Sequence, residues 1–379
     1  MRHLVPLLLS VVLTSPVVFA ADAPEVKKET PAAKKEAKPI SAAWKKQSVL
    51  TTMEAVADWQ LEHPSRHSKT DWTQGAGYAG IMALSRISAD SRYEQAMLKM
   101  GETNEWKLGK RVYHADDHCV AQTYLELYAK YKKPEMIAPT KERFIIANPK
   151  TSNLVHKGAS AGHRWTWCDA LFMAPPAFAK LWQATGDEKY LAFMDSEWKV
   201  TSDYLYDKEE HLYYRDDRYF EKREPNGKKV FWSRGNGWVM GGLARVLEIL
   251  PKDNKYRPFY ETQYKDMAAK ILSIQRPSGF WSTSLLDPDR ISQNETSGTG
   301  FFCYALAWGI NQGLLEKDKY LPAVKKSWDA LVSCVDKDGK LTHVQPIAAD
   351  PYKFPADRTE IYGVGAFLLS GAEIYKLAD

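Results

Sequence analysis

Six stretches of the chain share one pattern of polar and apolar positions. Each begins with polar or charged residues, passes through small residues, and continues as an almost unbroken apolar run. A helix that is apolar all round is expected in the interior of a protein, and self-similar segments indicate a repeat architecture. The pattern therefore predicts six buried helices, over residues 72–87, 115–131, 166–186, 232–250, 295–315 and 358–377.

The segments between these stretches have a different pattern. Residues 90–110, 188–207 and 260–275 carry apolar side chains at three- and four-residue spacing, with charged residues between them. This spacing is typical of an amphipathic helix that packs one face on a core. Six inner helices that alternate with six outer helices predict an all-α fold, the toroidal (α/α)6 barrel, with minor β content and a short strand in residues 211–216.

The amino terminus differs from the rest of the chain in composition. Residues 1–20 combine a basic start, an apolar run and small residues before the end, which is the pattern of a secretory signal peptide. Residues 21–40 are dominated by Ala, Lys, Glu and Pro, a composition that buries too little apolar surface to fold. We therefore predict an exported protein, periplasmic or secreted, with a disordered tether over 21–40 and one catalytic domain over 41–379.

Charge and hydropathy exclude some classes of partner. The formal net charge is +5 without a basic stripe, so we expect no nucleic acid as a partner. No later apolar run approaches the roughly 18 to 20 residues that span a bilayer, so we expect no membrane partner. The aromatic content of 12%, with 13 Trp, favours either sugar stacking or large core side chains.

The cysteines show no paired spacing, and we predict buried free thiols at Cys119, Cys168, Cys303 and Cys334.

Signatures of common cofactor and metal sites are weak. The GxGxxG match over residues 75–80 follows no predicted strand, so we interpret its glycines, like Gly242 and Gly365, as points of close helix packing. His114 and His118 lie four residues apart but form no HExxH motif. We therefore expect no cofactor and no metal.

The polar starts of the inner helices are expected to meet at one mouth of the barrel. Helix amino termini carry partial positive charge and free N–H donors, which suit an anionic ligand. Aromatic, carboxylate and arginine side chains in one cavity suggest a carbohydrate site. The residues expected there are Trp72, Asp116, Asp117, His118, Trp167, Asp169, Trp232, Arg234, Trp238, Glu295, Thr296, Arg358 and Glu360.

Two acidic positions at this mouth are candidates for acid–base chemistry. Asp169 is enclosed by Trp165, Trp167 and apolar neighbours, and burial of that kind raises the pKa of a carboxyl group. Asp116 and Asp117 begin a different inner helix, and like charges brought close push each other's pKa apart. The alternative roles are structural, an N-cap for Asp116 or Asp117 and a buried hydrogen-bond acceptor for Asp169.

Three motifs give the chain a family resemblance. The segments YHADDHCVAQTYLELY, WTWCDALFMAPP and FWSRGNGWVMGGLARVL, in this order, resemble the unsaturated rhamnogalacturonyl hydrolases of glycoside hydrolase family 105 and, more distantly, the unsaturated glucuronyl hydrolases of family 88. The resemblance implies an (α/α)6 barrel and oligosaccharide substrates that end in a 4,5-unsaturated uronic acid. It also implies that an acid protonates C4, water adds to C5, and the resulting hemiketal collapses to release the next sugar.

The resemblance further implies roles for individual acids. Asp169 matches the general acid and base of the family, in the W-x-D-x-L-x-M segment that begins at Trp167. The second essential acid matches the DD pair; we place it on Asp117, with Asp116 as the alternate and as a substrate contact.

The sugar-binding residues follow from a second motif. Trp232, Arg234 and Trp238 match a W-x-R-x-x-x-W box that lines the sugar site, where Arg234 would favour the negatively charged uronate. We add Trp72 to this set from its place at the mouth. Relatives often carry a His shortly before the box, where this chain has Arg215. That departure changes the expected sugar contacts and leaves pectin, ulvan, heteroglycan and arabinogalactan fragments as alternatives.

These observations predict a metal-independent hydrolase of unsaturated uronyl oligosaccharides. Two other functions stay open at this point. Another (α/α)6 sugar enzyme, an epimerase or isomerase, would use paired histidines, for which His114, His118 and His163 are the nearby candidates. A non-catalytic oligosaccharide-binding protein would keep the Trp and Arg side chains but would not need Asp169.

Overall fold

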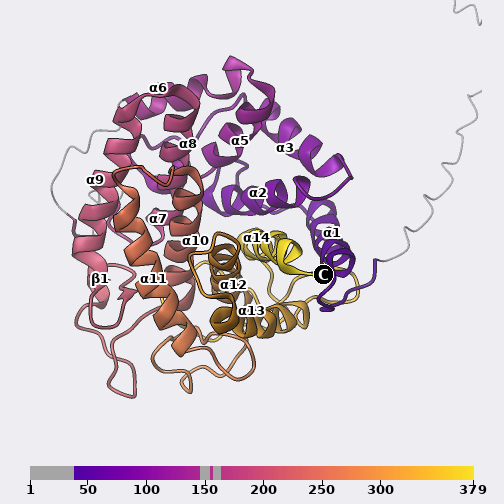
Figure 1. Ribbon diagram of the computed structural model, residues 1–379, viewed down its shortest axis with the longest axis vertical. Coiled ribbons are helices and arrows are strands. Elements are labelled where there is room, and N and C mark those ends of the chain that lie inside the picture. The colour runs from indigo at the N-terminus through magenta and orange to yellow at the C-terminus, as the bar shows by residue number, and fades with distance from the viewer. Residues whose placement is uncertain (1–37, 146–153, 157–163) are drawn as a thin grey trace, which may run out of the picture. The chain divides into compact units, whose positions relative to one another are not determined.

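The computed structural model describes residues 38–145, 154–156 and 164–379, most of them in helices (Figure 1). The helices are α1 (Lys46–Glu62), α2 (Trp72–Ser85), α3 (Arg92–Thr103), α4 (Ala115–His118), α5 (Ala121–Tyr131), η1 (Pro134–Met136), α6 (Ala138–Ile145), α7 (Ala170–Met173), α8 (Pro175–Thr185), α9 (Glu188–Leu205), η3 (Asp217–Tyr219), α10 (Ser233–Ile249), α11 (Arg257–Ser273), α12 (Thr296–Asn311), α13 (Lys317–Val332) and α14 (Ile361–Leu377). The predicted signal peptide, the predicted tether up to residue 37, and His163 lie outside the described residues.

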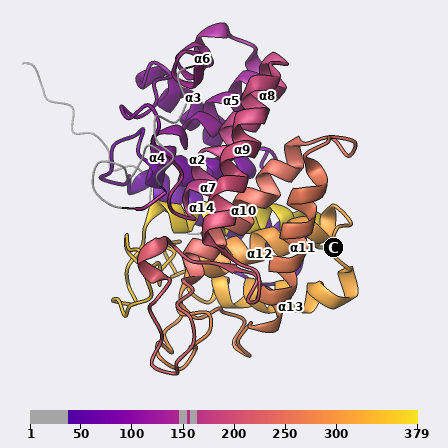
Figure 2. The same cartoon turned by 90° about the vertical axis from the view of Figure 1, so that its left-hand side faces the viewer.

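A closed ring of helices forms the centre of the fold. α2 packs against α5, α5 against α8, α8 against α10, α10 against α12, α12 against α14, and α14 against α2. The short helices α4 and α7 precede α5 and α8 in the chain. Figure 1 shows α12 and α14 inside, with α1, α3 and α9 toward the periphery, and Figure 2 shows the same helices from the side. The predicted inner ring is therefore confirmed.

The remaining long helices cover this ring from outside. α1 packs on α14 and α2, α3 on α2 and α5, α9 on α8, α11 on α10, and α13 on α12. In α3 only one side is buried, through residues such as Tyr93, Met97 and Met100. In α12 every residue from Thr296 to Ile310 is buried. This contrast matches the two sequence patterns. With the short helix α6, which follows α5 in the chain and packs on η1, the outer helices in the described part of the chain number six and complete the (α/α)6 barrel.

Two of the predicted inner helices are broken. In the third, α7 ends at Met173 and α8 begins at Pro175, because a proline has no N–H to donate and is tolerated only in the first turn of a helix. In the second, α4 and α5 are separated by Cys119 and Val120, which keep right-handed helical backbone angles. The third inner helix also begins at Ala170, so that Asp169 stands immediately before it.

Glycines bring the inner helices into backbone contact. A Cβ atom on Gly80 would lie 2.5 Å from the carbonyl oxygen of Gly365, and one on Gly365 would lie still closer to that of Ala76. A Cβ on Gly242 would meet the carbonyl oxygen of Leu171 in the same way. Real Cβ atoms do not approach so closely, so these positions accept only glycine at this spacing. The GxGxxG match lies inside α2 and serves helix packing.

The β content is one small hairpin. β1 (Tyr206–Asp207) pairs antiparallel with β2 (Leu212–Tyr213), with Tyr206 opposite Tyr213 and Asp207 opposite Leu212. The predicted strand is thus confirmed but is shorter than residues 211–216. All four cysteines are buried and free, as predicted.

The end of the predicted tether contacts the barrel. The Nζ atom of Lys38 lies 2.9 Å from Glu54 and 3.0 Å from Asp58, both on α1. Residues 38–40 therefore pack with the folded unit. Within the described part of the chain, no helix has the length and apolar character needed to cross a membrane.

Candidate active site

The amino-terminal ends of the inner helices meet at one end of the barrel. Trp72, the first residue of α2, stacks on Tyr362 of α14 with ring centroids 5.3 Å apart. Gly298, in the first turn of α12, packs against Ser233, the first residue of α10. These contacts join first-turn residues of neighbouring helices, so the predicted mouth exists. The acids Asp116 and Asp169 lie at the corresponding ends of α4 and α7.

Asp116 and Asp169 form an electrostatically coupled pair across this mouth. Burial and, second, the negative charge of Asp169 together raise the pKa of Asp116 to about 8, against the opposing charges of Arg111 and Arg215. Asp116 is therefore protonated at neutral pH. A carboxyl group of this kind keeps a proton available near pH 7 for acid–base chemistry.

Asp169 has a cationic partner that its aromatic surroundings do not reveal. Its side chain is mostly buried next to Trp165 and Trp167, as predicted, and the Sγ atom of Cys168 donates to its Oδ2 at 3.6 Å. The Nε atom of Arg215 lies 3.4 Å from the same oxygen. The structure thus brings Arg215 directly onto Asp169.

Arg215 is held in place by groups on its other side. Its Nη1 donates to Asp216 at 2.6 Å and lies 3.1 Å from Nε2 of His156. Asp216 is fully buried, but hydrogen bonds from Arg218 and Arg215 keep its pKa below the usual range despite that burial. Asp216 therefore stays charged and fixes the guanidinium beside Asp169. His156 was not identified from the sequence, because a single His forms no motif.

Asp117 forms an ion pair with Arg111. Its carboxylate accepts hydrogen bonds from the backbone N–H of Arg111 at 2.6 Å, from Nε at 3.1 Å and from Nη2 at 2.5 Å. These contacts hold the pKa of Asp117 below its usual range, although burial acts in the opposite direction. Asp117 thus anchors the loop before α4. This geometry does not support Asp117 as the second catalytic acid and favours Asp116, the alternate.

The Trp-Arg-Trp box lies beneath the mouth surface. Arg234 is almost fully buried, and its guanidinium lies 4.5 Å from the ring centre of Trp232 and 4.9 Å from that of Tyr362. Its Nη1 and Nη2 donate to the backbone carbonyls of Gln345 at 2.5 Å and Pro346 at 2.8 Å. Arg234 therefore holds the loop before α14 against α10. The expected contact between Arg234 and the uronate is not formed by a guanidinium enclosed in this way.

The two tryptophans of the box are also enclosed. Trp232 is buried and donates from Nε1 to Gln345 at 2.8 Å. Trp238 has no exposed surface and packs on Phe301, with ring centroids 4.3 Å apart. Both side chains form the wall beneath the site, whereas sequence analysis placed them against the sugar. Trp72, by contrast, is only partly buried and stays at the mouth.

The two histidines on the DD segment do not form one site. The ring of His118 is buried, lies 4.8 Å from the ring of Phe144, and has its Nε2 atom 2.9 Å from the carbonyl oxygen of Val112. The ring of His114 instead contacts Trp167, at a centroid distance of 4.8 Å. Burial lowers the pKa of His118 to about 4 and that of His114 to about 3, so both are neutral at pH 7. Among the described residues, no group of three His, Cys, Asp or Glu side chains is placed to hold a metal ion.

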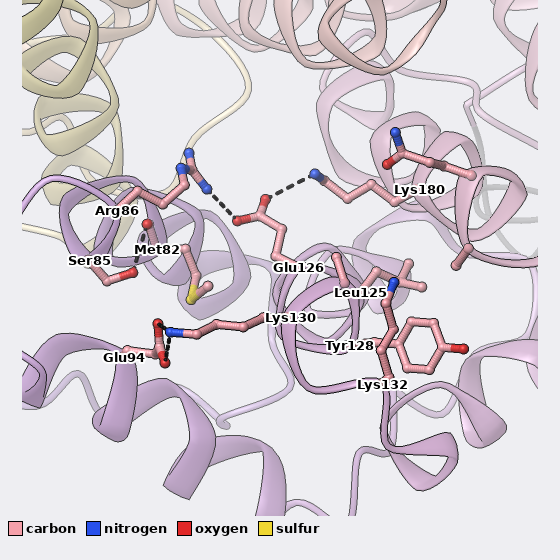
Figure 3. Close-up of a pocket in the computed structure, with 13 residues that line it drawn as sticks. Met82, Ser85, Arg86, Glu94, Leu125, Glu126, Tyr128, Lys130, Lys132 and Lys180 are labelled. Carbon is pink, nitrogen blue, oxygen red and sulfur yellow. Dashed lines mark hydrogen bonds and ion pairs between the residues drawn. The ribbon is translucent and has the colours of Figure 1, made fainter.

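A pocket away from the acid pair lies between the carboxyl-terminal parts of α2, α5 and α8 (Figure 3). Its volume is about 750 Å³, and its centre is Glu126, which pairs with Arg86 at 2.8 Å and Lys180 at 3.2 Å. Burial disfavours the charge of Glu126, but Lys180, Arg86 and Arg245 together lower its pKa well below the usual range. This pocket therefore offers no carboxyl group with a proton to donate, because both of its carboxylates, Glu94 and Glu126, are ion-paired. The acid–base chemistry belongs to the mouth.

The comparisons with known proteins show the family of the chain. Residues 44–378 match the family described as Glycosyl Hydrolase Family 88. The chain is 43% identical over 336 residues to the unsaturated 3S-rhamnoglycuronyl hydrolase of Formosa agariphila, covering 85% of this chain and 89% of that protein. It is 35% identical over 347 residues to a protein of the same name from an Alteromonas species, covering 85% and 84%.

A solved structure gives the same result. The structure titled as a family 88 glycosyl hydrolase from Bacteroides vulgatus superposes with a TM-score of 0.80 at 31% identity, covering 88% of this chain and 99% of that one. The match over nearly the whole described barrel agrees with the family resemblance of the three motifs. The protein is therefore a glycoside hydrolase and belongs to Glycosyl Hydrolase Family 88.

Proposed function

We propose that the protein releases a 4,5-unsaturated uronic acid from the non-reducing end of oligosaccharides in which the next sugar is a sulfated rhamnose. Two relatives with substantial identity are named unsaturated 3S-rhamnoglycuronyl hydrolases, which we take to name a rhamnose sulfated at O3. The observation that carries the proposal is the coupled pair of Asp116 and Asp169 beside Arg215, with a proton held near neutral pH.

The pair supplies both halves of an acid–base reaction. With one proton on the pair, Asp169 delivers it to C4 of the unsaturated sugar, as the motif match implies, and positive character develops at C5. A water molecule then adds its oxygen to C5 and returns a proton to the emptied pair, so the enzyme ends as it began. The hemiketal at C5 opens to a ketone, and the hemiacetal left at C1 collapses to release the next sugar. No metal is needed for any of these steps.

Arg215 has a defined part in this scheme. Its Nε atom lies 3.4 Å from Oδ2 of Asp169 and fixes the position of that carboxyl group. The proton that is present near pH 7 lies on Asp116, so it passes to Asp169 before Asp169 delivers it to C4. Arg215 also presents positive charge to the uronate of the substrate, the role that sequence analysis gave to Arg234.

The site geometry argues against the two other functions. An isomerase or epimerase of this fold would use paired histidines, but His114 and His118 have separate partners. A binding protein would have no use for a carboxyl group with a pKa of about 8. The hydrolase therefore explains features that the alternatives leave without a role.

A substrate panel tests the proposal. Lyase-generated disaccharides that carry an unsaturated uronate on 3-sulfated rhamnose, on unsulfated rhamnose or on galactosamine are incubated with the protein. The ultraviolet absorbance of the double bond is expected to decay fastest with the sulfated rhamnose compound, with release of a keto sugar. Decay with none of the three compounds would contradict the hydrolase, and decay only with the galactosamine compound would contradict the proposed substrate.

We also propose that the protein is exported to the periplasm and groups with the family 105 branch of these enzymes. The support for export is the signal-peptide pattern of residues 1–20, and the support for family 105 is the set of three motifs. Sequencing the amino terminus of the protein from periplasmic and cytoplasmic fractions tests export. A chain that retains residues 1–20 in the cytoplasm would contradict it.

A further inference from the structure

A second cavity opens on the loops at the mouth of the barrel. Its volume is about 410 Å³, and it is lined by Arg66, Lys340, Asp357, Arg358 and Thr359. Arg66 lies on the loop between α1 and α2, and the other four residues lie on the segment between α13 and α14. The cavity is therefore built by the two connections that lead into the adjacent inner helices α2 and α14.

This cavity lies on the same end of the barrel as the acid pair. Arg358 and Thr359 come directly before α14, whose residue Tyr362 stacks on Trp72 of α2. The negative charges of Asp71, the N-cap of α2, and of Asp116 both act on Arg111. The start of α2, which follows the loop that lines the cavity, is therefore near the charges that surround Asp116. A sugar bound next to the unsaturated ring has the partly exposed Trp72 and this cavity within the same mouth.

The lining carries positive charge that the protein does not neutralise. It holds three cations, Arg66, Lys340 and Arg358, and one carboxylate, Asp357. Among the described residues, the side chains of Arg66 and Lys340 have no carboxylate within ion-pair distance. Arg358 lies 3.8 Å from Glu360, a carboxylate that His67 also approaches, at 3.5 Å.

Two other arginines near the mouth are paired with carboxylates. Arg111 is paired with Asp117 and Arg215 with Asp169 and Asp216. Positive charge free to meet a ligand is therefore gathered in the cavity rather than spread over the mouth. Such charge favours an anion and not a neutral sugar.

The donors that the cavity offers suit one kind of ligand. They are the guanidinium groups of Arg66 and Arg358 and the ammonium group of Lys340. Such groups match the several oxygens of an oxyanion.

We propose that this cavity binds the sulfate ester of the sugar next to the unsaturated uronate, through Arg66 and Arg358. The inference rests on the proposed function, since it assigns the residues that recognise the sulfated substrate. A sulfate monoester carries one negative charge on three terminal oxygens, and the lining has two cations in excess of its carboxylate. The sulfate takes no part in the chemistry, so this contact acts on substrate binding.

Two charge-removing variants test the assignment, Arg66→Gln and Arg358→Gln, at low ionic strength. Each is assayed on the unsaturated disaccharide with 3-sulfated rhamnose and on the same disaccharide after desulfation. We expect each variant to lower kcat/KM for the sulfated compound about tenfold, mainly by raising KM, because one charge-assisted contact is lost. For the desulfated compound we expect less than about a twofold change, because no such contact exists there.

The matched control is Lys69→Gln, which removes the same charge from the loop that carries Arg66. Lys69 is exposed and lies outside the cavity lining. It is expected to leave both substrates unaffected. Equal losses on both compounds, or no loss with either variant, would overturn the sulfate subsite while leaving the hydrolase intact. If the wild-type protein cleaves neither compound, the proposed function itself fails, and the subsite fails with it.

Discussion

Asp169→Asn is expected to lower the rate of double-bond hydration by at least about 1,000-fold at every pH, since a positioned general acid contributes roughly 100- to 10,000-fold. The amide has the shape of the carboxyl group but neither gives a proton to C4 nor takes one from water. Arg215 keeps its contact with Asp216, so the surrounding structure should persist. The measurement is the decay of ultraviolet absorbance of the unsaturated disaccharide from pH 4 to pH 9.

Folding of this variant is checked by its thermal unfolding curve, which should stay close to that of the wild type. A small change is expected because the introduced amide oxygen would still accept the weak hydrogen bond from Cys168. If Asp169→Asn retained the wild-type rate at any pH in this range, Asp169 would not be the group that exchanges protons with the substrate.

Asp116→Asn is expected to change the pH dependence as well as the rate. In the wild type, the pKa of Asp116 is raised to about 8, so the pair holds its proton below that pH and loses it above. Activity should therefore fall on the alkaline side near pH 8. The variant lacks the group that stores the proton, so its alkaline limb should move toward about pH 4, where ordinary carboxyl groups titrate. At pH 7 the rate should fall about 100-fold or more, with partial recovery in acid.

The matched control for this variant is Asp117→Asn, one residue along the same helix start. Its side chain is bound to Arg111, and its charge is only the smallest of those that raise the pKa of Asp116, so the alkaline limb should shift slightly below pH 8 at most. Some stability should be lost, because a charged partner of Arg111 is removed. An unshifted pH profile in Asp116→Asn, together with a shifted one in Asp117→Asn, would reverse the assignment of the two acids.

Much of the fold could be predicted because its signals are local. Whether a helix is apolar on all sides or on one side is visible within a single segment, and that difference separates α12 from α3. The breaks at α4 and α7 were not predicted, because an apolar run continues through both of them. Pro175 was a visible signal for the second break, since proline starts helices more readily than it continues them.

The candidate site could be predicted only in part. The sequence located Asp169 and the DD pair at one mouth, and the family resemblance added Arg215 as a sugar contact. The structure brings Asp169 and Arg215 into contact. Asp116 and Asp117 are neighbours in the sequence and have similar local surroundings. The sequence therefore could not decide which of the two is the second acid of the site. The enclosure of Arg234 was also hidden, because its partners Gln345 and Pro346 are more than a hundred positions away in the chain.

By itself, the sequence determined the helical repeat, the ring that the repeat closes, and the motifs that place acids at one end of it. These features follow from side-chain periodicity and helix starts, which depend on neighbouring residues. The tertiary structure decided which acid stores the proton, which arginine faces the pair, and where the unpaired positive charge of the mouth collects. Those properties depend on burial and on charges from distant segments, such as Asp169 beside Asp116 and Arg358 beside Arg66, and they arise only when the ring closes.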